Sequence, residues 1–118
     1  MKVIGIVGAR SRDTSKDYIA VRDAFRSVYV GGDRLVSGGC PKGADRFAEC
    51  IAQQCGLTIT IHYPAGGDFR TAAYARNTLI AQDADVLIAC VAPDRRGGTE
   101  DTIAKFKRIH HQGELILC

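Results

Sequence analysis

Apolar and polar positions alternate along the chain in two patterns, which predict strands and helices in turn. Short continuous or alternating apolar runs predict five strands, at residues 3–7, 34–36, 57–61, 85–91 and 115–117. Apolar residues that recur every three or four positions predict four helices, at residues 18–28, 44–55, 72–82 and 99–111. Such alternation is typical of an α/β fold. We therefore predict a Rossmann-like domain with a five-stranded, mainly parallel sheet and helices on both faces.

Length and composition fit one such domain. The chain has 118 residues, of which 46% are hydrophobic and 25% are charged, and this is ordinary globular composition. Five strand-and-helix units of roughly 24 residues use up the whole chain, and no repeat or low-complexity segment divides it. We expect residues 1–118 to form a single domain, so that any site is built from its own loops or completed by a second copy.

Charge, hydropathy and cysteine content narrow the class of protein. Sixteen basic residues against 13 acidic ones give a net charge of +3, which does not by itself predict binding to nucleic acid or to a membrane surface. No apolar run approaches the roughly 20 residues of a membrane helix, and no signal sequence precedes the first strand. The five cysteines show no CxxC or zinc spacing and are typical of free thiols. We expect a cytoplasmic protein without a metal, a cofactor or a membrane partner.

Glycine, hydroxyl and guanidinium groups concentrate after the predicted strands. The carboxyl ends of parallel strands meet at one edge of a sheet, and ligands bind there in such folds. The opposite edge carries plain turns at residues 31–33 and 82–84. This asymmetry is the strongest functional signal in the sequence. The candidate ligand-binding residues in the strand-to-helix loops are Gly8, Arg10, Ser11, Ser37, Gly38, Gly39, Lys42, Gly43, Asp45, Gly97, Gly98 and Thr99.

The loop after the second strand resembles a phosphate cradle. Gly38 and Gly39 would let the backbone approach a ligand, and a helix beginning near Lys42 would point free N–H groups at an anion. A turn that needs glycine only for its backbone conformation would show the same pattern. The loop is not a Walker motif, and the first strand is not followed by G-x-G-x-x-G, so ATPases and dehydrogenases are disfavoured.

A second candidate anion site precedes the last predicted helix. Thr99 can cap this helix, and Glu100 and Asp101 suit the positive end of its dipole, as acids in a first helical turn commonly do. Alternatively, one of these carboxylates faces the crevice and acts on a ribose hydroxyl or a water. Several arginines at this edge are suited to phosphate binding, although nearby aspartates predict that some form structural ion pairs. These arginines are Arg10, Arg70, Arg76, Arg95 and Arg96.

Four polar motifs and one apolar strand occur in the order seen in a known superfamily. They are Gly8-Ala9-Arg10-Ser11, Ser37-Gly38-Gly39-x-x-Lys42-Gly43-Ala44-Asp45, Ala75-Arg76-Asn77 at the opening of the third predicted helix, Asp85-Val86-Leu87-Ile88-Ala89, and Gly97-Gly98-Thr99. Over almost the whole chain this pattern resembles the SLOG superfamily. The nearest branch is that of the small, stand-alone YspA/YpsA-like proteins, which are related to the DprA and LOG families.

The resemblance implies a domain that binds a nucleotide or nucleotide-derived ligand along the glycine-rich edge, often as a homodimer. It makes Arg76 the counterpart of a phosphate-contacting arginine, with Asn77 in the same motif. LOG enzymes release a base from a nucleoside 5′-monophosphate with an Arg and a Glu near a PGGxGTxxE motif. Here the proline and one spacing residue are absent, and Thr102 stands where the motif has its Glu. Glu100 or Asp101 would have to replace that catalytic carboxylate.

Three functions follow from these features. The leading one is a sensor or binding module for a nucleotide-type ligand. The alternative is a phosphoribohydrolase-like enzyme, in which Arg76 and the 38–43 loop hold the phosphate while Glu100 or Asp101 serves catalysis. DprA-like binding of single-stranded DNA is disfavoured by the charge of +3 and by the lack of an aromatic stacking platform. The sequence leaves open whether the protein is an enzyme.

Overall fold

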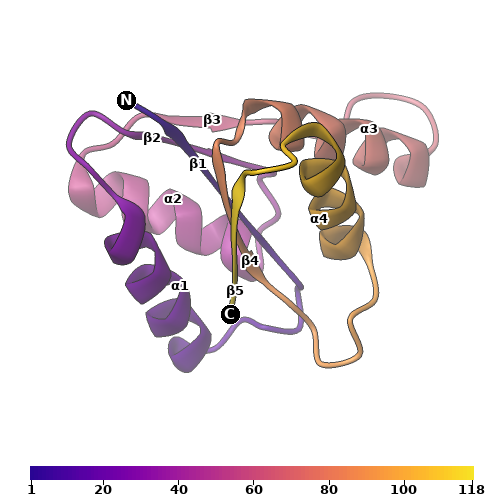
Figure 1. Cartoon of the computed structure of the whole chain (residues 1–118). Helices are drawn as coiled ribbons and strands as arrows, with labels where there is room; N and C mark the ends of the chain where they lie inside the picture. Colours follow the sequence, from indigo (N-terminus) through magenta and orange to yellow (C-terminus); the bar gives the residue numbers. More distant parts are fainter.

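Strands and helices alternate from end to end in the computed structural model, which describes residues 1–118 (Figure 1). The strands are β1 (Val3–Gly8), β2 (Arg34–Ser37), β3 (Ile59–Ile61), β4 (Val86–Cys90) and β5 (Glu114–Leu117). The helices are α1 (Ser15–Val28), α2 (Ala44–Cys55), α3 (Phe69–Asp83) and α4 (Gly98–Ile109). All nine elements were predicted from the periodicity of the sequence.

The five strands form one sheet in the order β3-β2-β1-β4-β5, and every neighbouring pair is parallel. Gly5 of β1 lies between Val36 of β2 and Leu87 of β4. This arrangement confirms the predicted Rossmann-like α/β fold. The chain builds outward from β1 first to one side and then to the other, so the order reverses between β1 and β4. Ligands of such sheets bind at the carboxyl ends of the strands beside this reversal.

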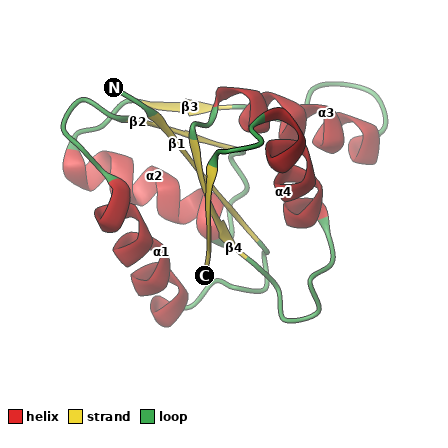
Figure 2. Ribbon diagram, in the orientation of Figure 1, coloured by secondary structure: helices red, strands yellow, loops and turns green.

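Two helices cover each face of the sheet (Figure 2). Successive side chains of a strand point to opposite faces, so Ile6 packs in the core that contains Phe47 of α2, while Val7 packs in the core that contains Phe106 of α4. The first core lies under α1 and α2 and the second under α3 and α4. The crossovers therefore place α3 and α4 side by side, with their N-terminal ends toward the glycine-rich loops.

Several helix boundaries differ from the predicted ones. The Asp68 side chain accepts a hydrogen bond from the Thr71 amide and caps α3, which starts three residues earlier than predicted. Arg76 and Asn77 therefore lie in the third turn of α3, whereas the resemblance suggested that they open this helix. Helix α4 has Gly97 at its N-cap without a side-chain cap, so Thr99 lies in the first turn and does not cap the helix.

Helix α4 also differs in extent from the prediction, whereas α2 spans the predicted residues 44–55. Helix α2 begins at Ala44, two residues after Lys42, and Gly43, with a positive φ of 78°, forms its entry. Helix α4 ends at Ile109, before the predicted end at residue 111, and the His110 side chain instead bonds the carbonyl of Ala81 at 2.8 Å. The earlier end of α4 does not affect its buried residues, Thr102, Ile103 and Phe106.

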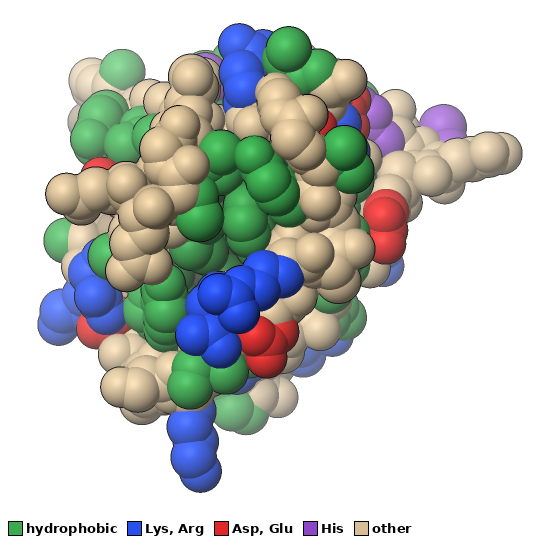
Figure 3. Space-filling view, turned by 90° about the vertical axis from the view of Figure 1, so that its left-hand side faces the viewer, with side chains coloured by type: hydrophobic (Ala, Val, Ile, Leu, Met, Phe, Trp, Pro, Cys, Tyr) green, Lys and Arg blue, Asp and Glu red, His purple; other side chains and the backbone are tan.

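Hydrophobic side chains remain visible in a hollow on the face seen from the left-hand side of Figure 1, with basic side chains beside it (Figure 3). Apolar atoms make up much of any folded surface, so this hollow alone indicates no site.

The longest helix, α3, has 15 residues, and no helix combines the length and apolar character needed to span a bilayer.

Candidate functional site

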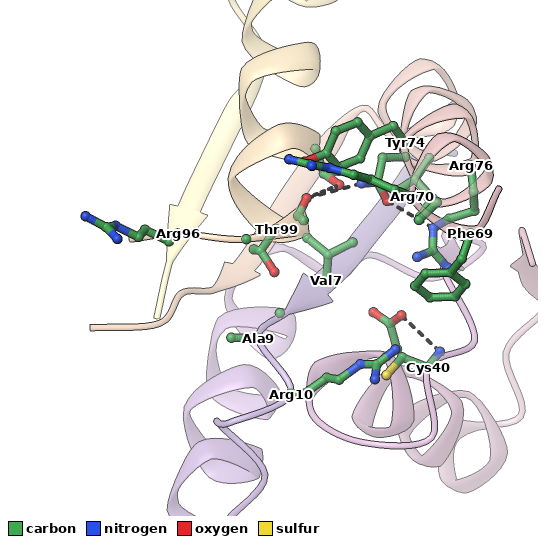
Figure 4. Close-up of a pocket in the computed structure, with 18 residues that line it drawn as sticks. Val7, Ala9, Arg10, Cys40, Phe69, Arg70, Tyr74, Arg76, Arg96 and Thr99 are labelled. Atoms are coloured by element: carbon green, nitrogen blue, oxygen red, sulfur yellow. Dashed lines mark hydrogen bonds between the residues drawn. The ribbon is translucent and has the colours of Figure 1, made fainter. Parts of the chain in front are cut away.

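A cavity of about 400 Å³ opens beside the carboxyl end of β1, between α3 and the first turn of α4. Its volume lies in the range of small-molecule sites, roughly 300–1,000 Å³. Val7, Ala73 and Ile80 give it an apolar wall, and polar groups from four loops and helices surround that wall (Figure 4). Its place in the fold is the edge at which the sequence predicted a ligand.

Eight of the 14 predicted ligand-binding residues line this cavity. The loop after β1 contributes Gly8 and Arg10, and α2 contributes Asp45. The remaining five come from α3 and from the entry to α4: Arg76, Asn77, Gly97, Gly98 and Thr99. The six that lie outside the lining are Ser11, Ser37, Gly38, Gly39, Lys42 and Gly43.

The first turns of α3 add cavity residues that were not among the predicted site residues. Phe69, Arg70 and Tyr74 line the cavity, together with Cys40 and Thr102. Residues 69–71 were predicted to be loop because the apolar periodicity of this helix begins only at Ala72. The signal that could have found them is Asp68, a good N-cap residue, three positions before Thr71.

Gly38 and Gly39 make room for the protein's own side chains. A Cβ at Gly38 would lie 2.6 Å from Nη1 of Arg76 and 2.8 Å from Oδ2 of Asp45. Gly39 has a φ of 73°, and its missing side chain leaves space for the ring of Tyr63. These glycines are thus required because the β2–α2 loop packs against these side chains, and the side of each glycine that lacks a Cβ is covered.

The N-terminus of α2 already has an anion beside it. The amide of Gly43 donates to Oδ1 of Asp13 at 2.8 Å, and Nη2 of Arg46 donates to the same oxygen at 2.8 Å. The hydrogen bond from Arg46 and that from Gly43 lower the pKa of Asp13. Lys42 and Ser11 are exposed and form no hydrogen bond through their side chains. The carboxylate of Asp13 therefore occupies the position that the phosphate-cradle hypothesis reserved for a ligand.

Asp45 and Arg76 form a polar group in the lining of the cavity. The Cys40 amide donates to Oδ2 of Asp45 at 3.1 Å, and the Ser37 hydroxyl lies 3.1 Å from Oδ1 of Asp45. Burial raises the pKa of Asp45, while the Cys40 hydrogen bond, the charge of Arg76 and Ser37 act in the opposite direction. Arg76 donates through Nη1 to the Gly38 carbonyl, which fixes the guanidinium against the β2–α2 loop.

Asn77 connects Arg76 to the entry of α4. Its Oδ1 accepts from Nε of Arg76 at 2.9 Å, and its Nδ2 donates to the Gly98 carbonyl and to Oδ2 of Asp101, both at 3.2 Å. The side chain is nearly inaccessible, and all of its hydrogen-bonding groups except one acceptor position are used. Asn77 therefore holds α3 and the first turn of α4 together at the cavity.

The two carboxylates predicted as catalytic are held in ion pairs. Glu100 accepts two hydrogen bonds from Arg95, at 2.8 and 3.0 Å. Asp101 accepts from Nζ of Lys105 at 2.8 Å as well as from Asn77. Neither Glu100 nor Asp101 lines the cavity.

The cavity carries a net positive charge equal to that of the whole chain. Four arginines and one aspartate line it, which gives +3, and the rest of the chain therefore holds 12 basic and 12 acidic residues. Arg10 and Arg70 extend toward the cavity from opposite sides, whereas Arg96 points away from it (Figure 4). None of these three forms an ion pair with an acidic side chain. The first turn of α4 adds the partial positive charge of a helix N-terminus.

Comparisons with known proteins show the fold. No family model matches the chain, and no curated protein matches it at a significant level. The chain is similar in structure to the molybdenum cofactor binding protein from the phototrophic bacterium Rippkaea orientalis, with a TM-score of 0.74 and 22% sequence identity. The match covers 98% of this chain and 75% of that chain. Almost the entire chain thus shares its fold with a protein of low sequence identity.

Proposed function

We propose that the protein is a binding or sensing module for a nucleotide or nucleotide-derived small molecule, as its resemblance to SLOG proteins implies. The anionic group of the ligand lies between Arg10, Arg70 and the first turn of α4. The observation that carries this proposal is the presence of Arg10 and Arg70, which extend toward one cavity and form no ion pair with an acidic side chain. Guanidinium groups and helix N-termini are the usual protein partners of phosphate.

Two further observations support a small-molecule site. The cavity stands at the carboxyl edge beside the reversal of strand order, which is the usual ligand position in open α/β sheets. The structurally similar protein from Rippkaea orientalis binds the molybdenum cofactor, so another chain with this fold holds a small molecule. The molybdenum cofactor therefore belongs among the ligands to be tested here.

Binding is favoured over bond cleavage. A phosphoribohydrolase-like reaction needs a carboxylate that can reach the reacting carbon and a water. Glu100 is paired with Arg95, and Asp101 is paired with Lys105 and Asn77, both outside the cavity lining. Asp45 is the one acidic residue in the lining, and it accepts a hydrogen bond from the Cys40 amide.

Cysteine labelling provides a direct test. Cys40 lines the cavity, whereas Cys55 is exposed at the end of α2, outside the cavity, and serves as an internal control. The protein is incubated with AMP, GMP, ADP-ribose, cyclic dinucleotides or the molybdenum cofactor and pulsed with N-ethylmaleimide, and both sites are quantified by mass spectrometry. A bound ligand slows labelling of Cys40 in proportion to 1 + [L]/Kd, about 100-fold at 100 Kd, and leaves Cys55 unchanged.

Charge variants show whether protection comes from the proposed anion site. Arg10→Gln combined with Arg70→Gln is expected to abolish protection of Cys40, while Arg108→Gln, an exposed position near the end of α4, leaves it intact. If no member of the panel protects Cys40 relative to Cys55 at millimolar concentration, the proposed function is wrong. Light scattering on the same samples measures whether the module is the predicted homodimer.

A further inference from the structure

Phe69 differs from every other phenylalanine in the chain. Phe25, Phe47 and Phe106 are at most 3% exposed, and each lies against another aromatic or imidazole ring. Phe69 is 65% exposed and takes part in no ring–ring or cation–π contact. A phenyl ring left in water forgoes the free energy that its burial would supply. The packing of the isolated chain therefore does not account for a phenylalanine at this position.

The position of Phe69 places its ring at the edge of the candidate cavity. It is the first residue of α3, and its ring lies at the margin of the cavity between Arg76 and Cys40 (Figure 4). The hydrogen bond from the Thr71 amide to Asp68, 3.0 Å long, fixes the first turn and hence the backbone of Phe69. The ring is thus held at the cavity by a capped helix and not by a free loop.

The residue that follows Phe69 on the same face of the helix is small. Residues four apart on a helix lie on the same face, and the next residue of α3 on the face of Phe69 is Ala73, which also lines the cavity. Ala73 carries only a methyl group, and the apolar side chain of Ile80 also lines the cavity from this helix. Small and apolar side chains of α3 therefore share the cavity with the exposed ring.

The cavity therefore offers an exposed aromatic ring as well as cationic groups. Arg10 extends toward Cys40 (Figure 4), the first turn of α4 also lines the cavity, and Arg70 lies over the ring of Tyr74, 5.7 Å from its centroid. We propose that Phe69 is a stacking surface for the planar heterocycle of the ligand, and that it selects nucleotides over sugar phosphates of equal charge. This inference rests on the proposed function and adds the feature that determines specificity.

Paired ligands separate the two contributions. AMP, GMP and ribose 5-phosphate each carry one phosphomonoester, but only the two nucleotides carry a base. Titration calorimetry gives the ratio of their dissociation constants for the wild type and for Phe69→Ala, Phe69→Tyr and Leu79→Ala. Leu79 is the matched control, because it lies on the same helix, is 46% exposed and is outside the cavity. All of these substitutions are at exposed positions, so the fold is expected to survive them.

The wild type is expected to bind at least one of the two nucleotides about 10- to 100-fold more tightly than ribose 5-phosphate, as one base–aromatic stack supplies. Phe69→Ala abolishes this preference by weakening nucleotide binding alone, whereas Phe69→Tyr and Leu79→Ala retain it. An equal loss for sugar phosphate and nucleotide in Phe69→Ala, or no loss, overturns the stacking role while leaving the proposed function standing. Failure of AMP, GMP and ribose 5-phosphate to bind the wild type overturns the inference, whereas the proposed function is overturned only if the whole labelling panel also fails to protect Cys40.

Discussion

Replacement of Asn77 by alanine tests the connection between the two helices that border the cavity. Asn77 is 5% exposed and makes three hydrogen bonds: it accepts from Arg76 and donates to the Gly98 carbonyl and to Asp101. Alanine removes all three and leaves Nε of Arg76, the Gly98 carbonyl and one oxygen of Asp101 without this partner. The entry to α4 then loses its side-chain link to α3, and the proposed anion site is less well fixed.

The free energy of unfolding is expected to fall by about 2–3 kcal/mol. A hydrogen bond contributes roughly 0.5–1.5 kcal/mol net, so three bonds give about 3 kcal/mol. Alanine has a better helix propensity than asparagine, which offsets about 0.5 kcal/mol of this loss. For a chain of 118 residues, a loss of this size lowers Tm by about 10 °C.

Urea denaturation followed by circular dichroism measures this loss. Thr78→Ala is the matched control, because Thr78 is the next residue of α3 and its hydroxyl contacts only the carbonyl of Tyr74 in the same helix. We expect the control to stay within about 0.5 kcal/mol of the wild type. If Asn77→Ala also unfolds within 0.5 kcal/mol of the wild type, the three hydrogen bonds give no net stability, and Asn77 is not the link that we describe.

Two further changes test the physical basis of the fold. Burial alone would raise the pKa of Asp33, but hydrogen bonds from Lys2 and from the Val30 amide lower it to about 2. The stability that this carboxylate contributes is therefore present above about pH 4 and is lost as the pH falls toward 2. Acid titration should show the wild type losing stability over this range relative to Asp33→Asn. Parallel acid curves for the two proteins would contradict this expectation. Gly38→Ala should cost about 1–3 kcal/mol in urea unfolding through the contacts with Arg76, whereas Gly31→Ala, where a Cβ meets nothing within 4 Å, should not; equal stabilities would show that the β2–α2 loop tolerates a side chain.

Periodicity predicted the architecture because each strand and helix buries one apolar face, and the spacing of the apolar residues on that face can be recognised within a short stretch of sequence. The run at β4 is buried at all five positions, and this is the pattern of a central parallel strand. The start of α3 was misplaced for a local reason. Its first turn carries Phe69 and Arg70 on the exposed side, so apolar periodicity begins only at Ala72, although Asp68 already caps the helix.

The site was harder to predict than the fold, because a glycine in the sequence does not show what faces it. Gly38 and Gly98 both follow a strand, and both were assigned to ligand binding on the same grounds. In the structure, the side of Gly38 that lacks a Cβ is filled by Arg76 and Asp45, whereas a Cβ on Gly98 would meet only Asn77, at 3.7 Å. Asp45 is close to Gly38 in the sequence, but Arg76 comes from α3, 38 residues away, and no local pattern contains that contact.

The contacts at the N-termini of α2 and α4 decide which of these two helix ends can receive an anion. At α2, Asp13 accepts from the Gly43 amide and from Arg46, so an incoming phosphate would have to displace a carboxylate that is already paired. At α4, the acids of the first turn are bound by Arg95 and Lys105 away from the cavity, and Gly97 and Gly98 leave the backbone open. Anions favour a helix N-terminus through its free N–H groups. The proposed ligand therefore has its anionic group at α4, and the predicted contribution of Lys42, which depended on the α2 end, is not part of that site.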